Sequence, residues 1–331
     1  MSLLRRLRLR AGAIVFDWPA YERRLRGAWL EIRNRNERIT TDSRGVRCEW
    51  RFTSDLHIAK VFPSTGARLM RRAFEDWPIV MRDAPAETAA PEVSFLIGHR
   101  GIERLPHLLA TLRSIAGQSG IPIECIVVEQ SASPEIAKRV PAWVRYVHTM
   151  VEPDRPYSRA WTFNAGASAA RSRVLICHDN DILVPARYAA EVRERIGEGW
   201  AFLDLKRFLF YLSPEETTRV LDGGALRTDV SANVVQNLRG GSIAAELDAY
   251  RAIGGFDPGF VGWGGEDNDF WDRAETTEKV DAFGYLPMIH LHHPFQPGKW
   301  SESSEAVARY RALESIPPRE RIARLLREER S

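Results

Sequence analysis

The chain has 331 residues, of which 44% are hydrophobic and 27% charged, as expected for a globular protein with one large or two smaller domains. Its formal net charge of +3 is too small to indicate nucleic-acid binding by itself, so we expect no nucleic-acid partner. No stretch approaches the roughly 18 apolar residues that a membrane-spanning helix needs.

Basic charge is concentrated at the start of the chain. Residues 1–40 contain ten arginines and four acidic residues, which leaves the remainder slightly acidic. One interpretation is peripheral contact with an anionic membrane surface. A solvated helix face explains the same pattern at least as well.

The cysteines indicate the compartment. Cys48, Cys125 and Cys177 form an odd set without a Cys-x-x-Cys pair. Cys125 and Cys177 lie in apolar, strand-like runs, where buried free thiols are the simplest interpretation. We therefore expect a reducing compartment and a cytoplasmic protein, with membrane association as an addition.

Composition divides the chain into three parts. Residues 1–90 carry mixed helix and strand signals and form an N-terminal extension of unclear role. The Pro- and Ala-rich stretch 82–92 predicts a linker into a main domain at 91–300. Residues 301–331 are charged and helix-prone, and Pro317-Pro318 interrupts them, so they predict a broken helical tail.

The main domain begins with alternating strand and helix patterns. Apolar runs at 93–99, 123–130 and 173–181 predict strands, and the segments starting at 105 and 157 have helical spacing. This alternation predicts an α/β fold with a mostly parallel sheet flanked by helices. Ligands bind beyond the carboxyl ends of the strands in such sheets. Polar residues stand at those ends, including His99-Arg100, Glu129-Gln130 and the 179–181 turn.

Asp179 and Asp181 form an Asp-x-Asp pair directly after an apolar strand. Carboxylates in that place suit Mg²⁺ or Mn²⁺, which bind one or two carboxylates together with phosphate oxygens. The alternative is an ordinary turn, because Asp and Asn are favoured in turns.

A second candidate is the histidine group in "PMIHLHHPF". Neutral imidazole can complete a metal shell, and alternating His290 and His292 would share one face of a strand. With the adjacent His293, the group equally fits a partly buried histidine cluster satisfied by hydrogen bonds.

The third candidate is "GFVGWGGEDNDFWDR", residues 259–273. Gly264 and Gly265 allow close backbone approach to a ligand, and Trp263 offers a flat face for a sugar. Glu266 and Asp267 can bind hydroxyls or act as a general base. The alternative is an acidic helix N-terminus stabilised by the helix dipole, and both interpretations can hold together.

Several ordered motifs resemble one group of enzymes. They are "SRAWTFNAGASAA" (158–170), "HDNDILVP" (178–185) and "LRGGSIAAELDAYRAIGGFDPGFVGWGGEDNDFWDR" (238–273). The region from about 93 to 300 resembles nucleotide-sugar glycosyltransferases of the GT-A fold. Its first half is similar to the family 2 group, and its second half resembles the β-1,4-galactosyltransferase type, including the related chondroitin-polymerase domains.

The resemblance implies roles on the donor side. Glu129 takes the place of a residue that contacts the uracil base, and Arg159 lies near the diphosphate. Asp181 is expected to bind the metal, Mn²⁺ or Mg²⁺, with Asp179 near the ribose or the metal. The late metal-binding histidine maps to 290–293; we favour His292, with His290 as the alternative, and leave the part of Met288 open.

The resemblance to glycosyltransferases also implies roles on the acceptor side. Trp263 lines donor and acceptor, Glu266 holds sugar hydroxyls, and Asp267 is the base that deprotonates the acceptor hydroxyl. The substrate-binding glycines are expected to be Gly241, Gly264 and Gly265.

Together these roles imply a metal-dependent inverting hexosyltransferase. It would move a hexose or N-acetylhexosamine from a UDP-sugar to a hydroxyl of a glycan or other acceptor, in polysaccharide assembly. A sugar nucleotidyltransferase and a catalytically silent nucleotide- or sugar-binding protein are the alternatives. The nucleotidyltransferase should carry a Lys- or Arg-rich phosphate loop, and "GHRGIERLP" has poor spacing and no lysine.

Overall fold

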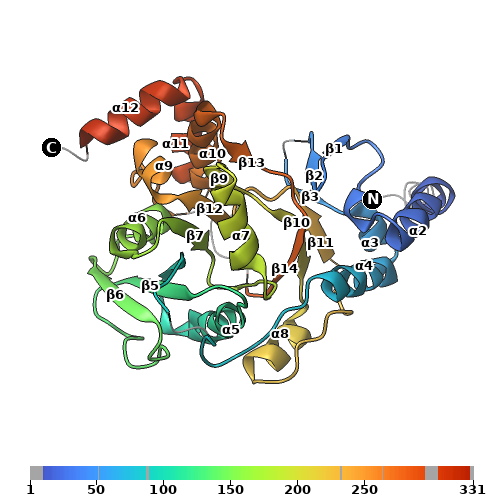
Figure 1. The fold of residues 1–331 in the computed structure, drawn as a ribbon, viewed down its shortest axis with the longest axis horizontal. Helices are drawn as coiled ribbons and strands as arrows, with labels where there is room; N and C mark the ends of the chain where they lie inside the picture. Colours follow the sequence, from blue (N-terminus) through green and yellow to red (C-terminus); the bar gives the residue numbers. More distant parts are fainter. Residues whose placement is uncertain are drawn as a thin grey trace.

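The computed structural model describes residues 10–50, 52–86, 89–231, 233–262, 264–294 and 305–328. Two β-sheets form the centre of the molecule, and helices pack around them (Figure 1). Among the helices of these residues, none has the length and apolar character needed to cross a membrane.

The larger sheet has seven strands in the order β13-β9-β12-β7-β4-β5-β6. Four of them are parallel neighbours, namely β4 (Val93–His99), β5 (Ile123–Ser131), β6 (Arg145–Met150) and β7 (Val174–His178). The others are β9 (Phe202–Leu203), β12 (Ser242–Glu246) and β13 (Val280–Asp281). Only β12 runs antiparallel to its neighbours, β7 and β9.

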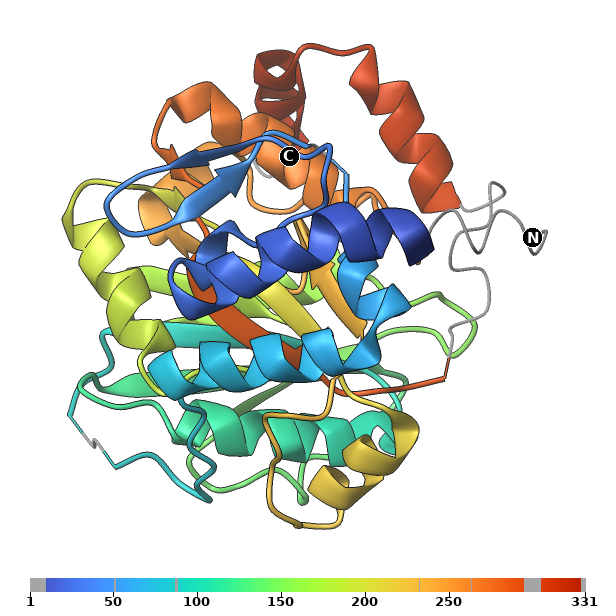
Figure 2. The same cartoon turned by 90° about the vertical axis from the view of Figure 1, so that its right-hand side faces the viewer.

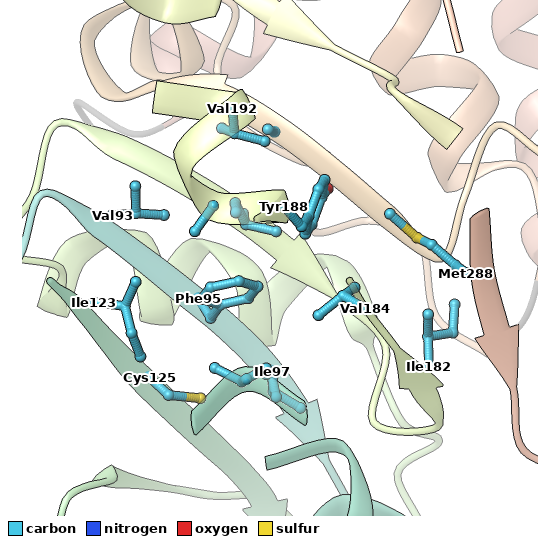
Figure 3. Close-up of a cluster of buried hydrophobic side chains, with 14 of the residues drawn as sticks. Val93, Phe95, Ile97, Ile123, Cys125, Ile182, Val184, Tyr188, Val192 and Met288 are labelled. Atoms are coloured by element: carbon cyan, nitrogen blue, oxygen red, sulfur yellow. The ribbon is translucent and has the colours of Figure 1, made fainter. Parts of the chain in front are cut away.

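Helices cover both faces of this sheet, so every residue of β4 and β5 is buried. On one face lie α5 (Leu105–Ala116) and α7 (Tyr188–Gly197); on the other lie α6 (Arg159–Ala169), α9 (Leu247–Ala252) and α10 (Glu266–Ala274). Figure 3 shows the first of these contacts, where alternate β4 side chains such as Phe95 meet Tyr188 of α7. The structure confirms the predicted α/β fold with a mostly parallel sheet between helices.

The second sheet has five strands in the order β3-β11-β10-β14-β8. Their bounds are β3 (Ser54–Asp55), β8 (Ile182–Leu183), β10 (Lys206–Tyr211), β11 (Asn233–Gln236) and β14 (Leu286–His290). The helix α8 (Pro214–Leu221) connects β10 to the segment before β11. Because β8 follows β7 after three residues, the end of the first sheet runs directly into the edge of the second.

The N-terminal extension is built into this second sheet. Its elements are η1 (Ala13–Asp17), α2 (Trp18–Arg26), η2 (Trp29–Glu31), β1 (Ile39–Thr41), β2 (Val46–Cys48), α3 (His57–Val61) and α4 (Pro63–Asp76). Its strand β3 pairs with β11, and α4 packs across β14 and β11 (Figure 2). Phe74 of α4 contacts Phe210 of β10 with ring centroids 5.7 Å apart. The described part of the predicted extension, from Ala13 to Phe74, therefore shares a core with the main domain.

The C-terminal tail forms α11 (Glu305–Glu314) and α12 (Pro318–Glu328), separated at Pro317 as predicted. Both helices pack on α10. Arg321 of α12 is 5% exposed and donates to Asp269 Oδ1 at 2.7 Å and to Asp272 Oδ2 at 3.2 Å. The tail therefore holds the helix that carries the candidate acids.

We expect Arg321→Ala to lower the free energy of unfolding by about 3 kcal/mol, because it breaks a buried ion pair on Asp269. Arg324→Ala, which removes a pair whose side chains are about half exposed, should cost less than about 1 kcal/mol. Urea denaturation of the two variants measures the difference. Equal losses would show that the tail does not hold α10 through this contact.

Candidate active site

The site is organised around Arg159, the first residue of α6. Ser158 caps this helix, its Oγ accepting from the backbone N–H of Trp161 at 3.3 Å. The guanidinium of Arg159 donates through Nε to Asp179 Oδ1 at 2.7 Å and through Nη1 to Asp267 Oδ1 at 2.5 Å. Glu266 Oε1 lies 3.6 Å from the same Nη1. One cation thus joins the predicted strand-end and helix-start acids.

The remaining guanidinium nitrogen of Arg159, Nη2, is buried and has no hydrogen-bond partner among the described residues. Burial alone would lower the pKa of Arg159, but Asp179, Asp267 and Glu266 outweigh it and raise the pKa well above its ordinary value. A charged donor is therefore left available in the site. Such a donor suits a ligand anion, for which Arg is well shaped.

Asp181 forms a cluster with two histidines. A carboxylate oxygen of Asp181 and one ring nitrogen from each of His290 and His293 all lie within 4.8 Å of one another. His290 Nε2 is 3.7 Å from Asp181 Oδ1, and His293 Nε2 is 3.5 Å from Asp181 Oδ2. Sheet pairing creates this proximity, because His290 at the end of β14 is in register with Ile182 of β8. Tyr211 stacks on His290 with ring centroids 4.3 Å apart and helps to fix the ring.

The structure places His292 outside this cluster. β14 ends at His290, so the strand alternation that would align His290 with His292 does not continue. His292 is exposed, while its backbone N–H donates to Thr217 Oγ1 and its carbonyl accepts from His107. The alternative, His290, lies in the cluster. Met288 is fully buried in the hydrophobic core (Figure 3).

Arg104 is a site residue that was not predicted. It ends the short helix η3 (Ile102–Arg104) and donates to Asp181 Oδ2 at 2.5 Å and to Asn180 Oδ1 at 3.2 Å. In the sequence it stood only in a stretch that lacks the spacing of a phosphate loop. Its contact with Asp181, which lies 77 positions further along the chain, depends on tertiary structure.

The acids at the start of α10 separate into two groups. Asp267 and Glu266 face Arg159, whereas Asp269 is buried between Arg273 and Arg321 in an ion-pair cluster. The acids in this stretch therefore differ in role: Glu266 and Asp267 belong to the candidate site, and Asp269 stabilises the helix and the tail.

Two glycines shape the start of α10. Gly264 has φ +114° and Gly265 has φ +90°, a region that favours glycine, and Gly264 N–H donates to Glu266 Oε2 at 3.1 Å. This turn folds the chain back so that Glu266 is buried beside Arg159. Trp263, predicted to line donor and acceptor, lies outside the described residues.

Gly241 connects the 238–273 motif to the Asp-x-Asp turn at 179–181 through a backbone hydrogen bond. Its carbonyl accepts from the backbone N–H of Asp179 at 2.8 Å, and its φ is +84°. The preceding residue, Gly240, has no room for a side chain, because a Cβ there would overlap the carboxylate of Asp267. Glycines at 240 and 241 thus let this segment pass between Asp179 and Asp267.

Glu129 is at the end of β5 as predicted, but the structure does not bring it to the other site residues. It is fully buried, and its carboxylate accepts from the backbone N–H groups of Glu135 and Ile136, from Ser131 and from Tyr146. Burial alone would raise the pKa of Glu129, yet these bonds outweigh it and lower the pKa. Protein donors thus surround this carboxylate, and contact between Glu129 and uracil stays a prediction.

The site carboxyls have different pKa values. Burial would raise the pKa of Asp181, but His290, Arg104 and His293 outweigh it and lower the pKa to about 2. Burial raises the pKa of Asp179 against the pull of Arg159, and with the charge of Asp181 it reaches about 6. Burial and then the charge of Asp267 raise the pKa of Glu266 to about 7, against Arg159. Asp181 is thus ionised at neutral pH, as a metal ligand must be.

Comparison with known proteins identifies one segment of the chain. Residues 232–293 match the model of a protein family described as the N-terminal domain of galactosyltransferase. A 59-residue stretch is 36% identical to β-1,4-galactosyltransferase 6 of Mus musculus, covering 16% of this chain and 15% of that protein. The predicted resemblance of the second half to galactosyltransferases is confirmed over this segment.

Two solved structures were also found similar. A glucosyl-3-phosphoglycerate synthase from Mycobacterium tuberculosis, in complex with Mn²⁺, UDP and phosphoglyceric acid, is 16% identical with a TM-score of 0.44, over 73% of this chain and 88% of that one. The mannosyltransferase PcManGT from Pyrobaculum calidifontis, in complex with GDP-Man and Mn²⁺, is 17% identical with a TM-score of 0.41, over 81% and 74% of the two chains.

The raised pKa of Glu266 predicts a pH-dependent stability. Between pH 4.5 and about 7 the folded state keeps a proton that the unfolded state has released, so stability falls as pH rises through this range. In Glu266→Gln this contribution is removed, and the variant should gain roughly 3 kcal/mol relative to wild type between pH 4.5 and 7.5, at about 1.4 kcal/mol per pKa unit. Denaturant unfolding across this range measures it. Parallel pH profiles would show that Glu266 is not perturbed.

Proposed function

We propose that this chain, which carries a galactosyltransferase-type segment at 232–293, is a metal-dependent, inverting glycosyltransferase of the GT-A type. The donor is a UDP-sugar carrying a hexose or N-acetylhexosamine, and the acceptor is a hydroxyl of a glycan or similar molecule. The observation that carries the proposal is the set of contacts made by Arg159. It binds Asp179, two residues before Asp181 of the candidate metal cluster, and it also binds Asp267, the candidate base. Its third nitrogen, Nη2, is a cationic donor without a partner among the described residues.

The residues of the cluster fit a divalent cation. Asp181 is ionised and supplies oxygen, and His290 and His293 supply nitrogen, all within mutual reach. Mg²⁺ strongly prefers oxygen ligands, whereas imidazole suits transition metals better, so two histidines favour Mn²⁺ over Mg²⁺. When bound, the cation would act as a Lewis acid that offsets charge on a nucleoside diphosphate.

Two arginines support the departure of that diphosphate. Arg159 has one unpartnered nitrogen beside Asp179, and Arg104 lies 2.5 Å from the Asp181 carboxylate. Both are fixed by hydrogen bonds before a ligand arrives, so they need little reorganisation to stabilise the charge that develops on the leaving group. Arg159 contacts Asp179 and Arg104 contacts Asp181, so both would lie near phosphates held at the 179–181 turn.

Asp267 has the position of a base. It lies at the start of α10, partly exposed, and Arg159 orients one carboxylate oxygen while Gly240 packs against the other. In the proposed reaction it takes the proton of the acceptor hydroxyl as that oxygen attacks the anomeric carbon. Attack opposite to the departing diphosphate inverts the configuration. Glu266, buried and hydrogen-bonded to Gly264, positions the turn beside Asp267 and the sugar.

The proposal includes a cytoplasmic setting, in which the free thiols of Cys125 and Cys177 would stay reduced; both are buried. It also includes peripheral membrane contact near the N-terminus, where Ile14, Val15 and Phe16 are each more than half exposed. A catalytically silent binding protein would share the donor site but show no turnover.

We expect Asp181→Ala and His293→Ala to weaken Mn²⁺-dependent UDP binding by at least about 100-fold. Loss of a residue that only supports a metal ligand lowers metal affinity by about 10–100-fold, and loss of a ligand itself should lower it more. His292→Ala, a matched histidine outside the cluster, should bind as wild type. Calorimetric titration of UDP with Mn²⁺, with Mg²⁺ and without metal measures these affinities. Loss of binding in His292→Ala alone would contradict the proposed ligand set.

We expect Asp267→Asn to lower kcat by about 10²–10⁴-fold, the usual contribution of a general base, while UDP binding stays nearly intact. Transfer is assayed with UDP-Gal, UDP-GalNAc, UDP-Glc and UDP-GlcNAc over a panel of glycan acceptors. Asp248→Asn, the same change on an exposed acid, is the control. Loss of UDP binding in a folded Asp267→Asn protein would contradict the assignment.

A further inference from the structure

A cavity of about 640 Å³ lies between the N-terminal extension and the main domain, and we refer to it as the extension cavity. It is lined by residues from several segments, which are Val46, Arg47, Cys48, Glu49, Trp50, Asp204, Lys206, Arg207, Asn237, Arg239, Glu275, Glu278, Val280 and Ala282. It does not contain Asp181, Arg159 or Asp267. The extension therefore forms one wall of a cavity separate from the site described above.

Backbone strain is concentrated at this cavity. Asn237 (φ +61°) and Glu278 (φ +59°) are the non-glycine residues with positive φ in the described ranges, and both line it. Such conformations cost roughly 1–3 kcal/mol each and persist where the surrounding structure fixes them, often at ligand sites. Two such residues on the wall of one cavity fit a ligand site better than simple packing.

An exposed aromatic pair stands at the edge of the extension cavity. Trp50 is 49% exposed and Phe52 is 68% exposed, and their rings meet edge to face with centroids 5.6 Å apart. Thr53, the next residue, donates from Oγ1 to the carbonyl of Asn237 at 3.4 Å and ties this segment to the opposite wall. Large exposed aromatic rings beside a polar cavity are suited to hold the apolar face of a ring-shaped ligand.

The charges of the cavity wall balance. The wall carries four basic side chains and four acidic ones, which are Arg47, Lys206, Arg207 and Arg239 against Glu49, Asp204, Glu275 and Glu278. Some are already paired with each other, as Lys206 is with Asp204 and Arg239 with Glu275. The wall thus offers many donors and acceptors without a net field that would select an anion or a cation. A neutral ligand rich in hydroxyl groups fits this chemistry.

The wall of the extension cavity adjoins the candidate active site along the chain. Arg239 lines the cavity, and the next residue, Gly240, packs against the carboxylate of Asp267. Lys206 of the wall donates to the carbonyl of Ser242, just after Gly241. The segment from Asn237 to Gly241 therefore contributes to the cavity wall and also contacts the site residues Asp267 and Asp179.

We propose that the extension cavity is a binding site for a neutral oligosaccharide, with Trp50 as its stacking surface. Resting on the proposed function, this ligand is the inner part of a glycan acceptor whose terminal hydroxyl lies at Asp267. The N-terminal extension then takes part in acceptor selection, because Trp50 belongs to it.

The first test is an array of neutral, amino and acidic oligosaccharides of two to eight residues, probed with wild type and Trp50→Ala without any donor. We expect wild type to bind neutral members, and Trp50→Ala to bind them at least about tenfold more weakly, a loss typical of a truncated aromatic anchor. Phe16→Ala, an exposed aromatic away from the cavity, should bind as wild type. No binding by wild type, or equal binding by Trp50→Ala, would overturn the proposal.

Cys48 offers an independent measurement because it lines the extension cavity and is partly exposed, whereas Cys125 and Cys177 are buried. Burial raises the pKa of these two thiols and makes them unreactive. N-ethylmaleimide should therefore alkylate Cys48, and the oligosaccharide bound on the array should slow that reaction, measured by intact mass. Cys48→Ser should remain unlabelled. Alkylation at the same rate with and without the oligosaccharide would overturn the proposal.

Calorimetry of UDP with Mn²⁺ separates this proposal from the proposed function. Trp50→Ala should bind UDP as wild type does, since Trp50 lies outside the donor site. Absence of UDP binding in wild type would remove the transferase proposal, while the array and Cys48 results would still decide whether the cavity binds oligosaccharides.

Discussion

Arg159 is the cation on which the site depends. Its guanidinium is shared by Asp179, Asp267 and Glu266, which come from a strand end and a helix start nearly ninety residues apart. Without it, three partly buried carboxyls would face one another, and their repulsion would have to be relieved by protonation or by movement of α10. The guanidinium carbon of Arg159 also lies 4.6 Å from the ring centroid of Phe163, a cation–π contact that stabilises the cation. One side chain therefore holds Asp179, at the turn that follows β7, beside Asp267, the proposed base on α10.

The proposed metal ligands come from both sheets. Asp181 follows β7 of the larger sheet, and His290 ends β14 of the smaller one, and the short strand β8 pairs the two regions. Leu291 N–H also donates to the carbonyl of Asp181 at 2.8 Å, so the backbones are joined where the ligands lie. Any relative movement of the sheets would open the cluster. Affinity for the cation is in this way linked to the packing of the second sheet.

The fold and much of the site could be predicted from the sequence because local patterns carried them. Continuous apolar runs marked β4 and β5, and the acids at 179–181 and 266–267 stood in recognisable motifs. Tertiary structure decides what local patterns do not show. The family resemblance favours His292, but β14 ends at His290, and His293 is the following histidine that approaches Asp181. A change of one residue reverses the face, and sequence periodicity does not show where a strand stops.

Two further site features depend on contacts between residues that are distant in the chain. Glu129 stands at a strand end like a ligand-binding residue, yet backbone N–H groups and Tyr146 surround its carboxylate. Arg104 lacked any motif, and only folding brings it to Asp181. Hydrogen-bond partners that are distant in the chain leave no local sequence pattern, so such contacts can be identified only in the folded structure.

The pairing of β3 with β11 has a consequence for how this chain can be divided. β3 is two residues long, but it covers the outer hydrogen-bonding edge of the sheet that contains His290. A fragment starting at residue 91 would expose the backbone groups of β11 and the apolar face beneath α4, and unprotected edges of this kind pair with other chains. The described elements from η1 to α4 are thus an integral layer of the protein, and an insoluble fragment without them would say nothing about the chemistry of the remainder.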